Sequence, residues 1–261
     1  MTGLRGGRSS PRPADLIRVM PAEGWQATSN SGPPPNKAEG FSSLRAVIFA
    51  NGELRDREAA LAALRPDDWL IAANGGSRHC LSLGLTPALI VGDLDSLPPE
   101  DLQNWLSAGV EIRRHPRRKD QTDLELAMQH VFERAPEAIL VLGGMGARWD
   151  HSLANLLLCF HPRLGEVPCI FIEGDQSIFA VRGKTRIDGA PGDLVSLIPV
   201  GGDAIGVTSS GLEYPLQDGR LPFGTSLGVS NVLVRPPATL EVRQGEVIAI
   251  VTRVASAGGA A

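Results

Sequence analysis

The chain has few cysteines, few aromatic residues and no long apolar run among its 261 residues. Its three cysteines, Cys80, Cys159 and Cys169, form no Cys-x-x-Cys pair and lie in apolar contexts, which predicts reduced core thiols in a reducing compartment. No apolar run reaches the length of a membrane span, and the N-terminus lacks the apolar core of an export signal. We therefore expect a cytoplasmic protein with no membrane partner.

An excess of positive charge is also lacking. The formal net charge is −4, so the chain as a whole creates no field that attracts a polyanion. One basic run, 113–119, has no interleaved aromatic residues and belongs to no known nucleic-acid module, so we expect no nucleic-acid partner. Most of its cations are expected to be solvated, and one or two of them to face a nucleotide's phosphates.

The length allows two domains, and the 43% hydrophobic content allows sizeable cores. Residues 1–43 are rich in Pro, Gly, Ser and Arg without periodicity, which predicts a disordered extension, and 255–261 is a small-residue tail. Strand and helix patterns alternate over 44–174, which predicts a Rossmann-like, mostly parallel α/β/α domain. Over 175–254, β-prone runs broken by Gly, Pro and Asp predict a small antiparallel β-sandwich.

The apolar patterns also predict individual elements. In the first domain we expect strands at 45–50, 69–73, 88–92, 111–115, 138–143 and 168–173. Between them we expect helices at 56–64, 77–83, 99–108, 122–135 and 152–160. The β-prone runs of the second domain are 176–187, 193–200, 204–214, 228–235 and 239–254.

Two carboxylates follow an apolar run in Val91-Gly92-Asp93-Leu94-Asp95-Ser96. Side chains two apart in extended chain point the same way, so Asp93 and Asp95 should project together from the carboxyl end of a strand, where α/β sheets bind ligands. Paired carboxylates repel unless a cation lies between them, and hard oxygen ligands suit Mg²⁺, which usually arrives with phosphates. The alternative is a solvated turn with an N-cap aspartate before a helix at Pro98-Pro99-Glu100.

A second polar cluster, Lys119-Asp120-Gln121-Thr122-Asp123, directly precedes a helical apolar repeat. Asp120 and Thr122 are therefore expected at or just before a helix N-terminus, where free N–H groups and the helix dipole favour anions. An ordinary capping pair of Thr122 with Glu125 would explain the threonine. It would not explain Lys119 or the second aspartate.

The third cluster, Gly143-Gly144-Met145-Gly146-Ala147-Arg148-Trp149-Asp150-His151, lies between a strand run and a helix. Glycine lets backbone N–H groups approach an anion, so this turn predicts a phosphate cradle, although its spacing is neither the dinucleotide fingerprint nor a Walker loop. Arg148 is suited to bidentate pairing with a phosphate. Asp150 and His151 would orient it, bind a metal through a water, or merely cap the helix.

These clusters, preceded by Asn74-Gly75-Gly76, occur in an order that resembles the thiamine pyrophosphokinases. Ser210-Gly211-Leu212-Glu213-Tyr214-Pro215-Leu216 and Ser230-Asn231 are similar to that family's thiamine-binding segments, so the resemblance spans roughly 45–253. The family usually has aspartate where this chain has Asn74, and an amide is a poor Mg²⁺ ligand. It often has tryptophan where this chain has Tyr214, which can still stack on a flat ring with less area.

The resemblance implies a diphosphokinase that transfers pyrophosphate from ATP to the thiamine hydroxyl, giving thiamine diphosphate and AMP, with Mg²⁺ as cofactor. It implies catalytic roles for Asp93, Asp95, Asp120, Asp123, Lys119 and Arg148, of which Asp93, Asp95 and Asp120 would hold the metal. It implies nucleotide contacts by Asn74, Gly75, Gly76, Ser96, Thr122, Gly144, Gly146, Asp150 and His151, and thiamine contacts by Tyr214, Ser230 and Asn231. It further implies a homodimer in which thiamine lies between one subunit's α/β domain and the partner's β domain.

Three alternatives stay open at this point. The same chemistry would serve another acceptor such as a 6-hydroxymethylpterin, although the β domain favours thiamine. A nucleotide-sugar glycosyltransferase also holds a metal with an Asp-x-Asp pair, but this leaves the cluster at Lys119–Asp123 unexplained. A non-catalytic nucleotide sensor is less favoured, because every acidic position of the pattern except Asn74 is retained.

Overall fold

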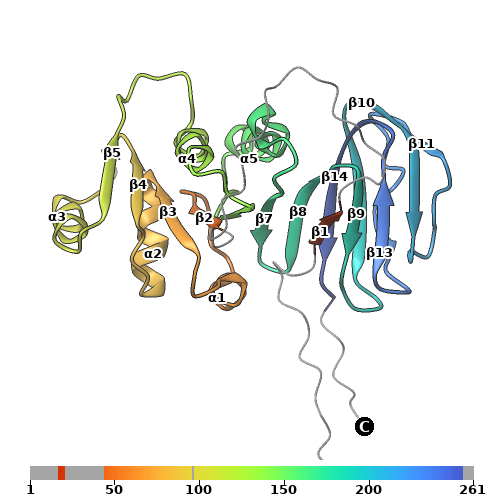
Figure 1. The fold of residues 1–261 in the computed structure, drawn as a ribbon, viewed down its shortest axis with the longest axis horizontal. Coiled ribbons are helices and arrows are strands. Elements are labelled where there is room, and N and C mark those ends of the chain that lie inside the picture. The colour runs from red at the N-terminus through yellow and green to blue at the C-terminus, as the bar shows by residue number, and fades with distance from the viewer. Residues whose placement is uncertain (1–16, 21–43, 96, 255–261) are drawn as a thin grey trace, which may run out of the picture. The chain divides into compact units, whose positions relative to one another are not determined.

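The computed structural model describes residues 17–20, 44–95 and 97–254 and divides the chain into two compact units. We call residues 21–180 the α/β unit, and residues 1–20 with 181–261 the β unit. In Figure 1 all of the labelled helices belong to the α/β unit, which also contains strands, and the labelled elements of the β unit are all strands. In the described part of the chain, no helix is both long and apolar enough to cross a membrane.

The α/β unit alternates strands and helices, as the sequence predicts. Its elements are β2 (Arg45–Phe49), α1 (Arg57–Ala63), β3 (Trp69–Ala73), the 3₁₀ turn η2 (Asn74–Gly76), α2 (Ser77–Leu83), β4 (Leu89–Gly92), α3 (Pro99–Ser107), β5 (Glu111–Arg114), α4 (Asp123–Phe132), β6 (Ala138–Leu142), α5 (Trp149–Leu157), the 3₁₀ turns η3 (Leu158–Phe160) and η4 (Pro162–Leu164), β7 (Cys169–Glu173) and β8 (Gln176–Val181).

The sheet of this unit has the strand order β8-β7-β6-β2-β3-β4-β5. Every neighbouring pair is parallel except β7 with β8, which form an antiparallel hairpin. The chain builds the sheet outwards from β2 to β5 and then returns to place β6 on the other side of β2. The strand order therefore reverses between β2 and β6, and in open α/β sheets ligands bind outside the carboxyl ends of the strands at such a reversal.

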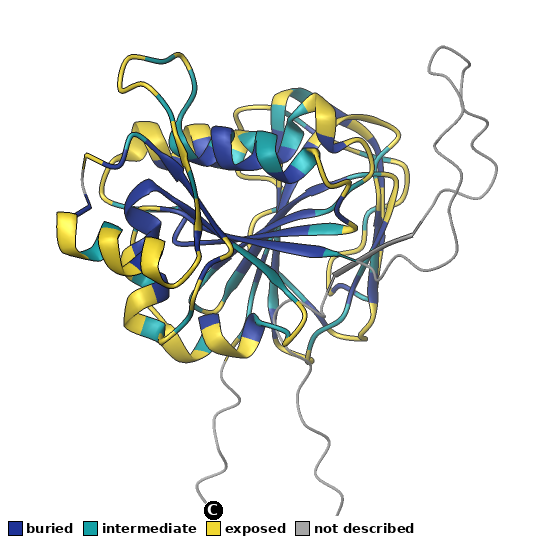
Figure 2. Ribbon diagram, turned by 60° about the vertical axis from the view of Figure 1, so that its left-hand side comes forward, coloured by how far each residue is buried: buried dark blue, intermediate teal, exposed yellow. Residues whose placement is uncertain are grey.

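Helices cover both faces of this sheet. Figure 2 shows α4 and α5 on one face and α1 and α2 on the opposite face, with buried strands between them. All five residues of β2 are buried, as expected for a parallel strand with a helix layer on each side. Helix α4 begins as predicted, because the Thr122 side chain accepts a hydrogen bond from the Glu125 backbone N–H at 3.2 Å.

The boundary between the units differs from the predicted one after residue 174. It falls after Ala180, because β8 turns back on β7 and pairs with it from Glu173–Gln176 to Ile170–Phe179. The β-prone run 176–187 is thus two strands, separated at Gly183, whose φ of 53° turns the chain.

Every strand pairing within the β unit is antiparallel. Its strands are β1 (Ile17–Met20), β9 (Lys184–Ile187), β10 (Leu194–Ser210), β11 (Gly219–Leu221), β12 (Asn231–Val232), β13 (Ala238–Glu241) and β14 (Gln244–Thr252). Strand β1 forms where no strand was expected, and the rest of the predicted extension and tail lies outside the described residues.

One long strand, β10, belongs to two sheets. Its first part pairs with β12 and β14, and its last residues, Thr208–Ser210, pair with β13 in the other sheet. The sequence predicts two runs, 193–200 and 204–214, where the structure has this one strand. The register shifts on either side of Ile205, and Gly201 and Gly206 have φ values of 72° and 70°, so glycine lets the strand bend without ending.

A buried ion pair ties the first strand of the α/β unit to its surroundings. The Arg45 guanidinium donates to both Asp68 carboxylate oxygens, at 2.7 and 2.6 Å, and to the Ala63 carbonyl at 2.8 Å. The two side chains are 6% and 1% exposed, so neither charge can be hydrated if its partner is removed. The pair fixes the start of β2 to the end of α1 and to the segment before β3.

We expect Asp68→Ala to lower the free energy of unfolding by about 3–5 kcal/mol, because it leaves the Arg45 charge buried and unpaired. Denaturant unfolding followed by circular dichroism measures this. The matched control is Asp67→Ala, an exposed neighbour, which should change the free energy by no more than about 0.5 kcal/mol. Equal effects of the two substitutions would contradict a special role for the pair.

Candidate active site

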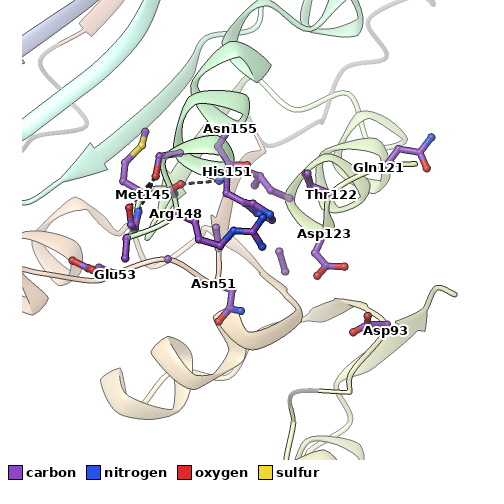
Figure 3. Close-up of a pocket in the computed structure, with 18 of the residues that line it drawn as sticks. Asn51, Glu53, Asp93, Gln121, Thr122, Asp123, Met145, Arg148, His151 and Asn155 are labelled. Atoms are coloured by element: carbon purple, nitrogen blue, oxygen red, sulfur yellow. Dashed lines mark hydrogen bonds between the residues drawn. The ribbon is translucent and has the colours of Figure 1, made fainter. Parts of the chain in front are cut away.

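A cavity of about 830 Å³ lies at the carboxyl ends of β2, β3, β4 and β6, where the strand order reverses. Figure 3 shows side chains from several segments facing this space. The lining residues are Ala50, Asn51, Gly52, Glu53, Ala73, Asp93, Asp95, Arg117, Lys119, Asp120, Gln121, Thr122, Asp123, Leu124, Gly144, Met145, Gly146, Ala147, Arg148, His151, Ser152 and Asn155. The structure thus brings the three predicted clusters to one place.

The acidic pair after β4 faces the cavity. Leu94 has a φ of 63° and is buried, so its side chain turns into the core while Asp93 and Asp95 on either side line the cavity. Burial alone would raise the pKa of Asp93. Hydrogen bonds with Asp95 and Asn74 and the charge of Lys119 outweigh it and hold that pKa below the usual value. Asp93 is therefore a carboxylate at neutral pH.

Asn74 joins this acidic pair to the next cluster. It lies at the end of β3 with a φ of 49°, a conformation that asparagine tolerates better than most residues. Its buried side-chain Nδ2 donates to Asp93 Oδ1 and to Asp123 Oδ2, both at 3.0 Å. Both partners are acceptors, so only the amide NH₂ group can bridge them. An aspartate at this position would instead place a third carboxylate between the other two.

Lys119 and Asp123 form the far side of the same network. Lys119 Nζ lies 2.5 Å from Asp123 Oδ1, and the two side chains are 13% and 27% exposed. Asp123 is the first residue of α4, while Asp120 lies on the exposed loop before it. Hydrogen bonds therefore run without a break from Asp93 through Asn74 and Asp123 to Lys119.

The glycine-rich turn after β6 is held by the segment after β2. The Gly52 N–H donates to the Gly143 carbonyl at 2.8 Å, and the Glu53 N–H donates to the Met145 carbonyl at 2.6 Å. A Cβ atom on Gly52 would lie 2.0 Å from the Met145 carbonyl oxygen, so only glycine allows this approach. The two segments form one wall of the cavity.

Side chains from α5 hold the same turn from the other side. Asn155 Nδ2 donates to the Gly144 carbonyl at 2.7 Å, and Ser152 Oγ bonds both the N–H and the carbonyl of Gly146. The Gly146 N–H is thus already paired within the protein, which differs from the expected open phosphate cradle. Gly144 has a packing reason as well, because a Cβ atom there would lie 2.5 Å from the Phe171 ring.

The remaining predicted site residues do not all reach the cavity. Arg148 and His151 line the cavity, and Asp150 pairs with Arg148 at 2.6 Å on the exposed rim. Gly75 and Gly76 do not line the cavity. They pack against the segment around the end of β2, and a Cβ atom on Gly76 would be 1.9 Å from the Phe49 carbonyl oxygen. Ser96 lies outside the described residues.

Sequence reasoning missed the segment after β2, which contributes Asn51, Gly52 and Glu53 to the cavity. The signal was an Asn-Gly pair directly after the first apolar run. Only the strand order shows that this pair lies at the cavity, because β2 is the strand at which the order reverses. Asn155 was missed for another reason, since it lies within an apolar helical repeat and its contact is with a backbone carbonyl.

The predicted metal ligands are only partly assembled. Among the described residues, no group of three or more His, Cys, Asp or Glu side chains is placed to hold a metal ion, so Asp120 does not complete a trio with Asp93 and Asp95. Mg²⁺ usually binds through one or two carboxylates together with waters and substrate phosphates. Two neighbouring carboxylates on the cavity wall, Asp93 being ionised, fit that mode of binding.

In the β unit, the predicted thiamine residues lie close together. The Tyr214 N–H donates to Asn231 Oδ1 at 3.1 Å, and Asn231 Nδ2 donates back to the Tyr214 carbonyl at 2.8 Å. Ser230, the residue before Asn231, donates its backbone N–H to Ser196 Oγ at 3.0 Å. The Tyr214 side chain is 68% exposed, so its ring is available for stacking.

Comparison with known proteins gives matches over both units. A family model described as "Thiamin pyrophosphokinase, catalytic domain" matches residues 62–171, and one described as "Thiamin pyrophosphokinase, vitamin B1 binding domain" matches 184–247. Thiamine pyrophosphokinase from Bacillus subtilis is 28% identical over 69% of this chain and 85% of its own length. Thiamine pyrophosphokinase 1 from Oryza sativa is 27% identical over 79% of this chain and 86% of its own.

Solved structures agree on the fold. The crystal structure of the Bacillus subtilis thiamine pyrophosphokinase matches with a TM-score of 0.72 at 24% identity, covering 81% of this chain and all of that one. Yeast thiamin pyrophosphokinase matches with a TM-score of 0.69 at 15% identity, covering 82% and 87%. The two family models follow one another along the chain, one on each unit, and the chain belongs to the thiamine pyrophosphokinase family.

Proposed function

We propose that the cavity of the α/β unit is where this chain transfers a pyrophosphoryl group from ATP to the hydroxyl of thiamine. The observation that carries the proposal is the convergence of three polar clusters, all within the catalytic-domain match, on one cavity at the strand reversal. In the reaction the hydroxyl oxygen attacks the β-phosphorus, its proton passes to a base, and AMP leaves. Positioning of the reactants and neutralisation of charge supply most of the rate enhancement.

Asp93 and Asp95 would hold Mg²⁺, and Asp120 on the cavity rim would bond its waters. An ion held there would supply positive charge to neutralise the phosphate oxygens. Asp93 itself needs no proton change at neutral pH, because its pKa is held below the usual value. Arg117 Nε lies 3.3 Å from Asp95 Oδ2, and both residues line the cavity.

Lys119 and Arg148 would stabilise the negative charge that develops on the transferring group. They approach the cavity from different elements, Lys119 from the loop before α4 and Arg148 from the turn after β6. Both carboxylate oxygens of Asp123 are already hydrogen-bonded, one to Lys119 and one to Asn74. These contacts let Asp123 position Lys119, and its remaining lone pairs leave it able to accept the hydroxyl proton.

The acceptor is assigned from the second domain. The match to a vitamin B1 binding domain over 184–247 includes Tyr214, Ser230 and Asn231, and it favours thiamine over a pterin. The catalytic-domain match likewise does not favour a nucleotide-sugar glycosyltransferase or a sensor. In this proposal the Tyr214 ring stacks on thiamine, and Asn231 fixes the backbone that carries it.

Two further parts of the proposal rest on the family resemblance. The chain would work as a homodimer whose acceptor site is shared between subunits. It would act in the cytoplasm, which is consistent with three buried cysteine thiols that form no disulfide.

The direct test is AMP release from Mg·ATP, with thiamine or 6-hydroxymethylpterin as acceptor, followed by chromatography. We expect AMP and thiamine diphosphate in equal amounts with thiamine, and AMP at the background hydrolysis rate with the pterin. AMP with the pterin alone would keep the mechanism and overturn the acceptor. AMP with neither would refute the function.

Asp93→Asn is expected to lower kcat by about a hundredfold or more at saturating Mg²⁺, because it removes a charge that faces the phosphates and their cation. Initial rates over a range of Mg²⁺ concentrations measure this. The control is Glu100→Gln on α3, an exposed acid of the same unit that does not line the cavity. Normal turnover in Asp93→Asn would show that this carboxylate holds no metal.

Asn74→Asp is expected to make stability depend on divalent metal. The change replaces an amide that donates to two carboxylates by a third negative charge, which should cost about 1–3 kcal/mol of the free energy of unfolding in a chelator. Mg²⁺ should restore most of that loss, because three carboxylates then share one cation. Thermal unfolding with EDTA or Mg²⁺ measures both effects, and Asn74→Ala, which adds no charge, serves as control. Equal melting temperatures of Asn74→Asp in EDTA and Mg²⁺ would refute this prediction.

A further inference from the structure

A carboxyl group that the proposed mechanism does not use lies behind the glycine-rich turn. Glu173 is the last residue of β7, is only partly exposed, and does not line the cavity. Its Oε1 accepts a hydrogen bond from the Met145 backbone N–H at 3.1 Å. It therefore contacts the turn that lines the cavity without lining the cavity itself.

This hydrogen bond lies in the middle of the turn, so it helps to fix the backbone conformation of residues 143–146. The carbonyls of Gly143, Gly144 and Met145 are held by Gly52, Asn155 and Glu53, and Gly146 is held by Ser152. Glu173 supplies the acceptor for the N–H at Met145, the middle of this set. Two residues beyond Gly146 the chain reaches Arg148, so the geometry of the turn sets where that guanidinium enters the cavity.

Glu173 is also poised to change charge near neutral pH. Burial raises the pKa of its carboxyl to about 7, against the hydrogen bonds from the backbone of Met145 and Gly144. The charged groups that face it are Arg55, which lowers the pKa, and Glu53, which raises it. Both belong to the segment after β2, and they pair with each other at 3.0 Å.

We propose that Glu173 is a positioning residue of the nucleotide site. As a carboxylate it accepts backbone N–H groups and holds the 143–146 turn in the form that binds ATP. As a neutral acid one of its oxygens becomes a donor and the other is a weaker acceptor for these N–H groups, so the turn is held less firmly and affinity for the nucleotide falls. The proposal rests on the proposed function in taking ATP as the ligand of this cavity.

The effect on folding has the opposite sign to the effect on binding. The folded pKa of Glu173 lies above the unfolded value of about 4.5, so the unfolded chain ionises first and the group costs stability progressively as pH rises from about 4.5 to about 7. Above that range the full cost remains. A neutral glutamine would avoid it, so Glu173→Gln should raise the melting temperature at about pH 8 while weakening the nucleotide site.

Calorimetric titration with Mg·ATP, without thiamine, measures the affinity for the nucleotide at about pH 8 and about pH 6 and so tests the predicted effect on binding. With a pKa of about 7, roughly a tenth of the wild-type molecules carry the carboxylate at about pH 6, so the apparent affinity should fall about tenfold. Glu173→Gln should bind more weakly than the wild type at about pH 8 and lose that extra tenfold dependence. Other titrating groups, including ATP itself, contribute to both proteins alike.

Glu166→Gln, an exposed acid shortly before β7, is the matched control and should keep the wild-type profile. If Glu173→Gln keeps the wild-type affinity and pH profile, the proposal is wrong. A measurement on the unmodified protein is independent of any folding defect in the variant. The ¹³C signal of the Glu173 carboxyl should titrate near pH 7, and saturating Mg·ATP should move its midpoint lower, as reciprocity of the coupling requires. An unmoved midpoint would overturn the proposal.

Failure of this proposal is distinguishable from failure of the proposed function. Formation of thiamine diphosphate by the wild type, together with an unchanged profile in Glu173→Gln, would reject Glu173 alone. A pH-dependent affinity for Mg·ATP that vanishes in Glu173→Gln, without any thiamine diphosphate, would reject the reaction and keep Glu173.

Discussion

The return of the chain from β5 to β6 is the constraint on which the site depends. Because β6 is placed beside β2, the segments that follow these two strands meet at the carboxyl edge of the sheet and line the cavity together. The close approach of Gly52 to Met145 joins them into one wall. Without this reversal, the acidic pair after β4 and the turn after β6 would belong to separate surfaces.

Most of the secondary structure follows from local patterns. Apolar runs located each parallel strand to within a residue or so, and the capping signal at Thr122 located the start of α4. These succeed because strand burial and helix capping are properties of neighbouring residues. The predicted clusters met in one cavity for a related reason, since parallel strands present their carboxyl ends on one edge.

What the patterns missed depends on contacts between distant residues. Asn51 and Glu53 reach the cavity because of the strand order. Glu173 contacts the site through a hydrogen bond with a turn 28 residues earlier in the chain. The split at Gly183 was missed because β propensity is the same on both sides of it. Asp120 was expected beside Asp93, but the loop before α4 carries it to the rim, and no local pattern encodes where such a loop lies.

Strand β10 has a consequence for how the β unit opens. Its residues complete ladders in two sheets, with β12 and β14 at one end and with β13 at the other. Neither sheet can lose this strand alone, because the same backbone runs continuously through both. Amide protons on the two sheets should therefore exchange with solvent in one shared opening event, and the β unit should behave as a single cooperative folding unit.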